Sequence, residues 1–203
     1  MKLAVTYGRF NYLSKGHINF IETILRSWDE VYLVLLVNDP NIYTKINYDE
    51  DTNNFIEMCN SNVNKKEILP ITHRLNAFSK AIRKNENLVG KVHLSVFCRP
   101  EVNVEHFNAC YPDKYFDMVF PKDHTTEWDR KKSEKFRDVF FREIFTVEPD
   151  FFTHNSDIVQ SGKYCEMLDG EAYKYYIENN IIKKEINKWK YYWLEHLIQN
   201  TMN

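Results

Sequence analysis

The stretch GRFNYLSKGH, close to the start of the chain, gathers groups that could bind a phosphate. Arg9 and Lys15 supply positive charge, and the imidazole of His17 could donate a hydrogen bond to a phosphate oxygen. Gly8 would let a ligand approach the backbone closely, and Gly16 would keep the first turn of a following helix clear of side chains. The chain has only 5 glycines, so two of them in one short stretch favour an anion site.

The elements around this stretch are predicted to place it where parallel sheets bind ligands. A strand is predicted over 3–7, a helix from Ser14, which is a plausible N-cap, and a buried strand over 30–39. Together they form a β–α–β unit. The loop over 8–14 then lies at the carboxyl end of the first strand, where free N–H groups and the positive end of the helix dipole favour anions.

The rest of the chain continues this alternation of strands and helices. Further helices are predicted over 50–61, 72–84, 128–145, 161–169 and 171–199, and further strands over 91–98, 116–120 and 150–154. The pattern predicts an α/β fold, a doubly wound parallel sheet with helices on both faces. Ligands of such sheets bind beyond the carboxyl ends of the strands.

Composition and charge narrow the classes of protein. A chain of 203 residues with 43% hydrophobic residues can bury a full core in one domain. The net charge of -2 argues against a nucleic-acid partner. No apolar run reaches the roughly 20 residues that span a bilayer, and no secretory pattern is present, so we expect a cytoplasmic protein without membrane contact.

No metal site is predicted from the cysteines and histidines. The 4 cysteines include no CxxC pair, so neither a zinc site nor disulfides are expected. His106 and Cys110 are four residues apart, but further paired ligands are lacking.

The opening stretch resembles the first signature of the HxGH nucleotidyltransferase superfamily, in the form GRFxPxHKGH that is typical of nicotinamide mononucleotide adenylyltransferases. The residues that match are Gly8, Arg9, Phe10, Lys15, Gly16 and His17. The usual proline is replaced near Leu13, and the first histidine is Ser14, where related branches have threonine. The resemblance implies a Rossmann-like nucleotidyltransferase domain over 1–170, followed by a C-terminal amphipathic helical extension over 171–203.

The segment DIVQSGKYCEMLDG, residues 157–170, resembles the second signature of the family, ISGTxIR followed by a helix. Its EML tail resembles the REML that is common there. Aligned without a gap, the arginine of the signature becomes Cys165, its threonine becomes Gly162 and its first serine becomes Gln160. Lys163 could supply the missing cation.

The resemblance implies direct nucleotidyl transfer, in which a substrate phosphate attacks the α-phosphorus of a nucleoside triphosphate and pyrophosphate leaves. His17 would contact the triphosphate, and Ser14 would take the place of the first histidine. Arg9, Lys15 and Lys163 would neutralise phosphate charge. Mg²⁺ would bridge the phosphates, held mainly by the substrates and water, with ATP as co-substrate.

The segment PKDHTTEWDRKK, which follows a predicted strand, holds candidates for a mononucleotide site. The resemblance points to Asp123 and Trp128, whose ring could stack on a nicotinamide. Alternatively, Asp123 caps a turn and Trp128 packs at a helix start. The full predicted binding set is Gly8, Arg9, Phe10, Gly16, Asp123, Trp128 and Lys163, beside catalytic Ser14, Lys15 and His17.

The predicted function is transfer of AMP from ATP to nicotinamide mononucleotide, which gives NAD and pyrophosphate. One alternative is a protein that binds nucleotides or dinucleotides with reduced or lost catalysis. Another is adenylyl or cytidylyl transfer to a different phosphorylated acceptor. The expected partners are small-molecule nucleotides, and the aromatic C-terminal stretch could pack on the core or on a second copy of the chain.

Overall fold

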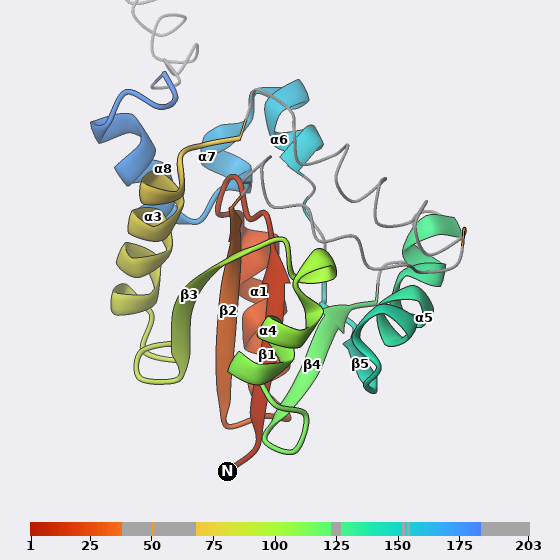
Figure 1. The fold of residues 1–203 in the computed structure, drawn as a ribbon. Coiled ribbons are helices and arrows are strands. Elements are labelled where there is room, and N and C mark those ends of the chain that lie inside the picture. The colour runs from red at the N-terminus through yellow and green to blue at the C-terminus, as the bar shows by residue number, and fades with distance from the viewer. Residues whose placement is uncertain (38–49, 51–67, 123–126, 152, 154, 184–203) are drawn as a thin grey trace, which may run out of the picture.

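The computed structural model consists of one parallel sheet and the helices around it. The described residues are 1–37, 50, 68–122, 127–151, 153 and 155–183, with the backbone alone described at 127–133 and 155–156. The strands are β1 (Leu3–Gly8), β2 (Glu30–Val37), β3 (Val92–Cys98), β4 (Phe116–Pro121) and β5 (Ile144–Val147). Their order is β3-β2-β1-β4-β5, and every neighbouring pair is parallel (Figure 1). This confirms the predicted α/β, Rossmann-like fold.

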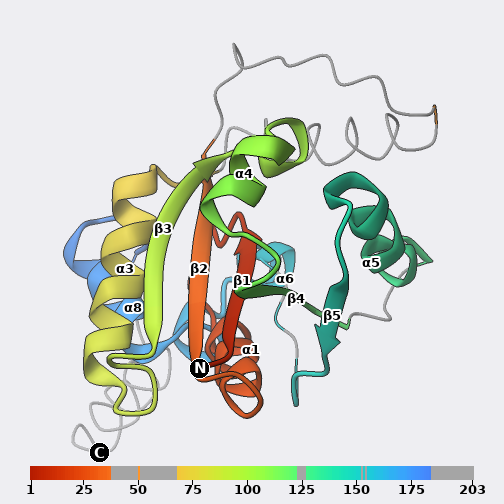
Figure 2. The same cartoon turned by 60° about the horizontal axis from the view of Figure 1, so that its bottom comes forward.

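Helices cover both faces of this sheet. They are α1 (Lys15–Leu25), α3 (Ile71–Lys84), α4 (Val104–Cys110), α5 (Glu127–Phe140), α6 (Asn155–Ser161), α7 (Tyr164–Met167) and α8 (Gly170–Glu178), with a 3-10 helix over Pro100–Val102. Helices α1 and α3 lie on one face, and α4 lies on the other (Figure 2). The chain winds from β1 towards β3 and then from β4 to β5, so the direction reverses between β1 and β4. Ligands of doubly wound sheets bind at such a reversal.

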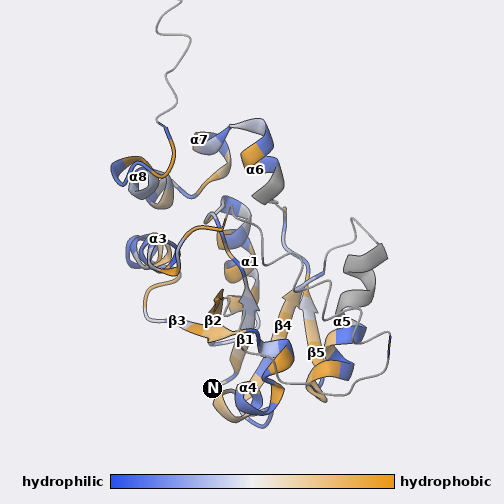
Figure 3. Cartoon of the chain, turned by 45° about the horizontal axis from the view of Figure 1, so that its top comes forward, coloured by the Kyte–Doolittle hydropathy of each residue, from blue (hydrophilic) through white to orange (hydrophobic). Residues whose placement is uncertain are grey.

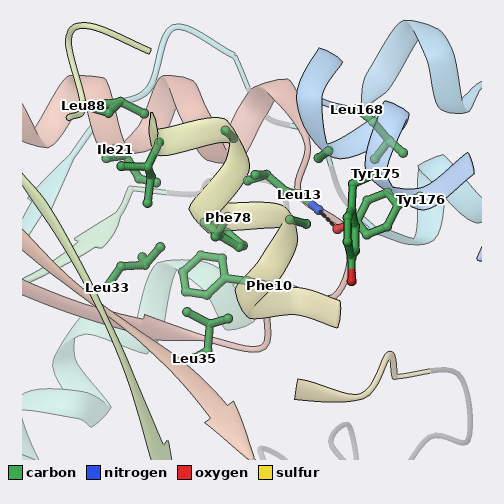
Figure 4. Close-up of a cluster of buried hydrophobic side chains, with 14 of the residues drawn as sticks. Phe10, Leu13, Ile21, Leu33, Leu35, Phe78, Leu88, Leu168, Tyr175 and Tyr176 are labelled. Carbon is green, nitrogen blue, oxygen red and sulfur yellow. Dashed lines mark hydrogen bonds between the residues drawn. The ribbon is translucent and has the colours of Figure 1, made fainter. Parts of the chain in front are cut away.

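Alternate side chains of β2 enter two different cores. Leu33 and Leu35 pack on the side of α1, α3 and α8 (Figure 4), whereas Val34 and Leu36 pack on the side of α4 and α5. The strands carry hydrophobic residues between helices that have hydrophilic outer sides (Figure 3). Burial on both faces explains why the sequence of β2 is an almost continuous aliphatic run.

The structure corrects two predictions around β5. The helix predicted over 128–145 ends at Phe140, because Phe141 has a left-handed φ of 52° and the next apolar residues form β5. The strand predicted over 150–154 is wrong, since none of its described residues lies in a strand. A four-residue run with three apolar residues fits a helix face and a strand equally well, so the sequence could not locate β5.

Two predicted helices after β5 also end earlier than expected. In place of the helix predicted over 161–169, Ser161 ends α6, Gly162 has a φ of 67°, and only the short α7 lies within the predicted range. The helix predicted over 171–199 begins as α8 but ends at Glu178, because Asn180 adopts a left-handed φ of 55°.

Some predicted elements lie outside the described residues. These are residues 184–199 of the C-terminal stretch and, apart from Glu50, the helix predicted over 50–61. In the part of the chain that the structure describes, no helix is both long and apolar enough to cross a membrane.

Candidate functional site

Helix α1 begins with a reciprocal pair of hydrogen bonds between Ser14 and His17. The backbone N–H of His17 donates to Ser14 Oγ at 3.2 Å, and the backbone N–H of Ser14 donates to His17 Nδ1 at 3.1 Å. This is a capping box with histidine at its third helical position, and it confirms Ser14 as the N-cap. The Ser14 residue is fully buried, so its hydroxyl holds the helix start and His17 in place.

The capping box fixes which imidazole nitrogen of His17 carries the proton. Nδ1 accepts the Ser14 N–H, and Ser14 Oγ lies 3.1 Å from the same nitrogen. In the neutral ring the proton is therefore on Nε2, which becomes a donor. The half-buried imidazole at this helix start is thus a hydrogen-bond donor through Nε2.

Phe10 and Gly8 shape the loop that leads from β1 to this helix. Phe10 has a left-handed φ of 43° and is 8% exposed, and its ring forms a T-shaped pair with the His17 imidazole at a centroid distance of 5.2 Å. A Cβ on Gly8 would lie 3.0 Å from the Phe10 ring. The Phe10 side chain therefore belongs to the core (Figure 4), and Gly8 makes room for it.

Three hydrogen bonds anchor the middle of the loop to distant parts of the chain. Leu13 N–H donates to the buried hydroxyl of Tyr176 at 3.1 Å (Figure 4), and Leu13 C=O accepts from Asp169 N–H at 3.1 Å. The N–H of Leu69 donates to Asn11 Oδ1 at 2.6 Å. Burial raises the pKa of Tyr176, so its hydroxyl stays protonated at neutral pH.

The segment 157–170 lies directly beside the start of α1. Ser14 and Leu168 form an antiparallel bridge, and Lys15 Nζ donates to the carbonyl of Glu166 at 2.6 Å. The two stretches that the sequence analysis singled out are therefore neighbours in space, although they are 151 residues apart at this contact. An ammonium has three donors, so this bond leaves Lys15 able to donate to a ligand.

Lys163 precedes α7 and lies at the surface. Its Nζ is 3.8 Å from Glu166 Oε2, and the two side chains are 64% and 66% exposed. Such an exposed pair is weak and can open for an anion. Cys165, which stands where the second signature has arginine, is an exposed cysteine.

Gly16 is the point at which the chain leaving β5 crosses α1. A Cβ on Gly16 would lie 2.7 Å from the backbone nitrogen of Thr153, so only glycine fits without a shift. Asp150 ties the same segment to α1 through Asn19 at 2.9 Å and Arg26 at 2.8 Å. These two partners hold the pKa of Asp150 below its usual value.

The structure describes the other predicted binding residues to different extents. Arg9 is exposed at the carboxyl end of β1. Asp123 lies outside the described residues. Trp128 belongs to α5, but its side chain is likewise outside the described part. Their roles in binding stay predictions.

Arg74, in the first turn of α3, is a residue of this region that the sequence did not single out. It is 3% exposed, and its guanidinium donates to the carbonyls of Leu69, Arg9 and Leu36. Its role is not visible in the sequence, because its partners are backbone carbonyls that no residue type reveals. Burial lowers the pKa of the Arg74 guanidinium, but an arginine stays charged at neutral pH.

The groups at this helix end suit phosphate oxygens better than a metal ion. His17, Lys15 and Arg9 bring donors and positive charge, and the start of an 11-residue helix adds its dipole. Among the described residues, no three side chains of the metal-binding types gather closely enough to hold a metal.

The comparisons with known proteins rest on structure alone. No family model matches the chain, and no curated protein is similar in sequence. Two structures of Plasmodium falciparum nicotinic acid mononucleotide adenylyltransferase, complexed with APC and with NaAD, each have a TM-score of 0.54. Their identities are 11% and 12%, and each match covers 88% of this chain and 96% of the other. The chain is thus similar in fold to these adenylyltransferases.

Proposed function

We propose that this protein is a nucleotidyltransferase that acts at the start of α1. The observation that carries the proposal is the Ser14–His17 capping box, with the segment 157–170 docked beside it. The box leaves the proton of a neutral His17 on Nε2, at a helix start that also carries Lys15. This is a donor set for the triphosphate of a nucleotide.

The proposed reaction is direct transfer of a nucleotidyl group. A phosphate oxygen of the acceptor attacks the α-phosphorus of the triphosphate, the bond to the bridging oxygen breaks, and pyrophosphate leaves with that electron pair. His17 Nε2–H donates to the triphosphate, and Lys15, Arg9 and Lys163 neutralise charge as it moves to the pyrophosphate. Ser14 positions His17 and does not touch the substrate. Catalysis then comes from positioning and electrostatic stabilisation.

The proposed nucleotide is ATP, and the proposed acceptor is a pyridine mononucleotide. Nicotinamide mononucleotide follows from the likeness of GRFNYLSKGH to the adenylyltransferase signature. The nicotinic acid form is equally supported, because the structural neighbours carry that name. The product would be NAD or its nicotinic acid analogue.

A second candidate function is nucleotide binding without turnover. Cys165 favours this alternative, because it stands where the second signature has an arginine. Lys163 stands nearby but already lies close to Glu166.

Pyrophosphate release decides between these functions. The protein is mixed with ATP, Mg²⁺ and, in separate reactions, nicotinamide or nicotinic acid mononucleotide. We expect release with one of the two, and a loss of about 100-fold or more in kcat/KM for His17→Ala. His106→Ala, on α4 and outside the site, is the matched histidine control and should keep normal turnover.

ATP binding without release for either acceptor would support the binding protein instead. If release continued unchanged in His17→Ala, the proposed site would be wrong.

A further inference from the structure

Arg74 holds together the carboxyl ends of two central strands. Its Nη1 donates to the carbonyl of Arg9, just after β1, at 2.5 Å and to the carbonyl of Leu36, near the end of β2, at 2.8 Å. Its Nε donates to the carbonyl of Leu69 at 3.0 Å, just before its own helix. One guanidinium therefore links three chain segments at the carboxyl end of the sheet, which is where ligands bind in this fold class.

These contacts connect Arg74 to His17 through the loop. The carbonyl of Arg9 belongs to the peptide that precedes Phe10, and Phe10 is held at a left-handed φ of 43°. A bulky residue adopts this conformation only where its surroundings enforce it. The Phe10 ring in turn supports the imidazole of His17 at a centroid distance of 5.2 Å.

Among the described residues, no carboxylate lies beside the buried charge of Arg74. Its acceptors are three backbone carbonyls, and no described acidic side chain forms an ion pair with it. Carbonyl dipoles stabilise the cation but do not neutralise it. The guanidinium therefore adds positive charge next to the loop, which favours an anion bound there.

We infer that Arg74 is a positioning residue for the phosphate-binding loop, which it fixes through the Arg9 carbonyl while adding buried positive charge next to it. The part of this inference that concerns nucleotide affinity rests on the proposed function. The part that concerns the loop does not depend on any ligand.

Arg142 provides a matched control elsewhere in the molecule. It is 7% exposed, and it donates through Nη1 to the carbonyl of Tyr111 at 2.6 Å and through Nη2 to the carbonyl of Phe116. Burial lowers the pKa of its guanidinium, as it does for Arg74. Phe116 begins β4, so Arg142 also donates to backbone carbonyls, but at the amino end of the sheet.

Amide hydrogen exchange of the ligand-free protein tests the positioning role. In Arg74→Met we expect the amides of residues 9–17 to exchange at least about tenfold faster than in the wild type. In Arg142→Met the increase should fall on residues 111–121 and leave 9–17 unchanged. Arg74→Lys keeps the charge but lacks the planar fork, so we expect an intermediate rate over 9–17.

Calorimetric titration with ATP and Mg²⁺ is the second readout. We expect Arg74→Met to weaken binding about tenfold more than Arg142→Met does, and Arg74→Lys to recover part of the loss. All variants are measured below their unfolding midpoints. If Arg74→Met does not fold, Arg74→Lys carries the comparison.

Unchanged exchange over 9–17 in the Arg74 variants would overturn the inference, and so would equal weakening of ATP binding by the Arg74 and Arg142 variants. If the wild type binds no ATP, the proposed function fails, whereas the exchange rates still decide the positioning role.

Discussion

At the scale of single residues, the proposed function gives His17 two tasks that use different nitrogens. Nδ1 accepts the Ser14 N–H and completes the cap of α1, while Nε2 carries the proton that would face a phosphate. Glutamine and glutamate are the usual partners in a capping box, because their side-chain oxygens accept the same N–H. Substitutions at this position can therefore separate the structural task from the binding task.

His17→Glu should keep the cap and lose the anion site. The carboxylate accepts the Ser14 N–H and suits the positive end of the helix dipole, but it repels a triphosphate. We expect the midpoint of thermal unfolding to stay within a few degrees of the wild type, with ATP binding lost in calorimetry. His17→Gln, which keeps an amide donor, should retain part of the affinity. Equal ATP affinity in His17→Glu and the wild type would contradict the role of Nε2.

Gly16 has no side chain because the backbone at Thr153 passes directly over it. Gly16→Ala would place a methyl group 2.7 Å from Thr153 N, so one of the two segments must move. We expect a loss of about 1–3 kcal/mol in the free energy of unfolding, measured in urea. Gly170→Ala is the control, because nothing lies within 4 Å of a Cβ there. A Gly16→Ala protein as stable as Gly170→Ala would show that the crossing is not tight.

At the scale of elements, the site depends on the contact between α8 and the loop that precedes α1. Tyr176 of α8 accepts the N–H of Leu13, and Asp169, the N-cap of α8, donates to the carbonyl of the same residue. Both backbone groups of Leu13 are thus held by one distant segment. The loop is ordered by α8 as well as by its own strand and helix.

Tyr176→Phe removes the acceptor of a buried N–H. The free energy of unfolding should fall by about 1–3 kcal/mol, the penalty for an unpaired buried donor. Tyr173→Phe, on the same helix, is the control, since its hydroxyl makes no hydrogen bond to any residue in the described ranges. Urea unfolding of both variants measures the difference. Equal losses in the two would mean that the Leu13 contact contributes nothing specific.

The sequence predicted those elements that have a long hydrophobic run or a clear helix cap. The strand–loop–helix–strand unit around the opening stretch was predicted correctly, because an aliphatic run and the Ser14 cap mark its limits. The end of α5 was not predicted correctly, because the charged helical pattern gives no sign that Phe141 adopts a left-handed φ. Arg74 and Thr153 were missed for a similar reason, because their contacts with distant segments involve backbone atoms, the Arg9 carbonyl for Arg74 and the Thr153 nitrogen beside Gly16.

At the scale of the whole molecule, the sheet, α1 and α8 form one continuous core. The cluster that holds Phe10 and Leu13 also contains Ala172 and Tyr176 of α8. A division of the chain near residue 170 would therefore cut through buried contacts. The site is at the carboxyl end of β1, beside the reversal between β1 and β4, where this fold class binds ligands.

Truncation tests whether α8 is part of the folded unit. We expect a chain of residues 1–169 to lose cooperative thermal unfolding, because the apolar surface around Leu13 and Phe10 would be exposed. A chain of residues 1–183, which keeps α8, is the comparison and should unfold cooperatively. Circular dichroism against temperature measures both. Cooperative unfolding of the shorter chain would make α8 an appendage.

The central claim is that His17 Nε2–H donates to a bound triphosphate at the start of α1. Nitrogen-15 NMR of histidine-labelled protein, recorded while ATP and Mg²⁺ are added, tests it most directly. We expect His17 to show a protonated Nε2 and an unprotonated Nδ1 in the free protein, and the Nε2–H signal to shift as ATP saturates the site. A proton on Nδ1, or a His17 spectrum that saturating ATP leaves unchanged, would contradict the claim.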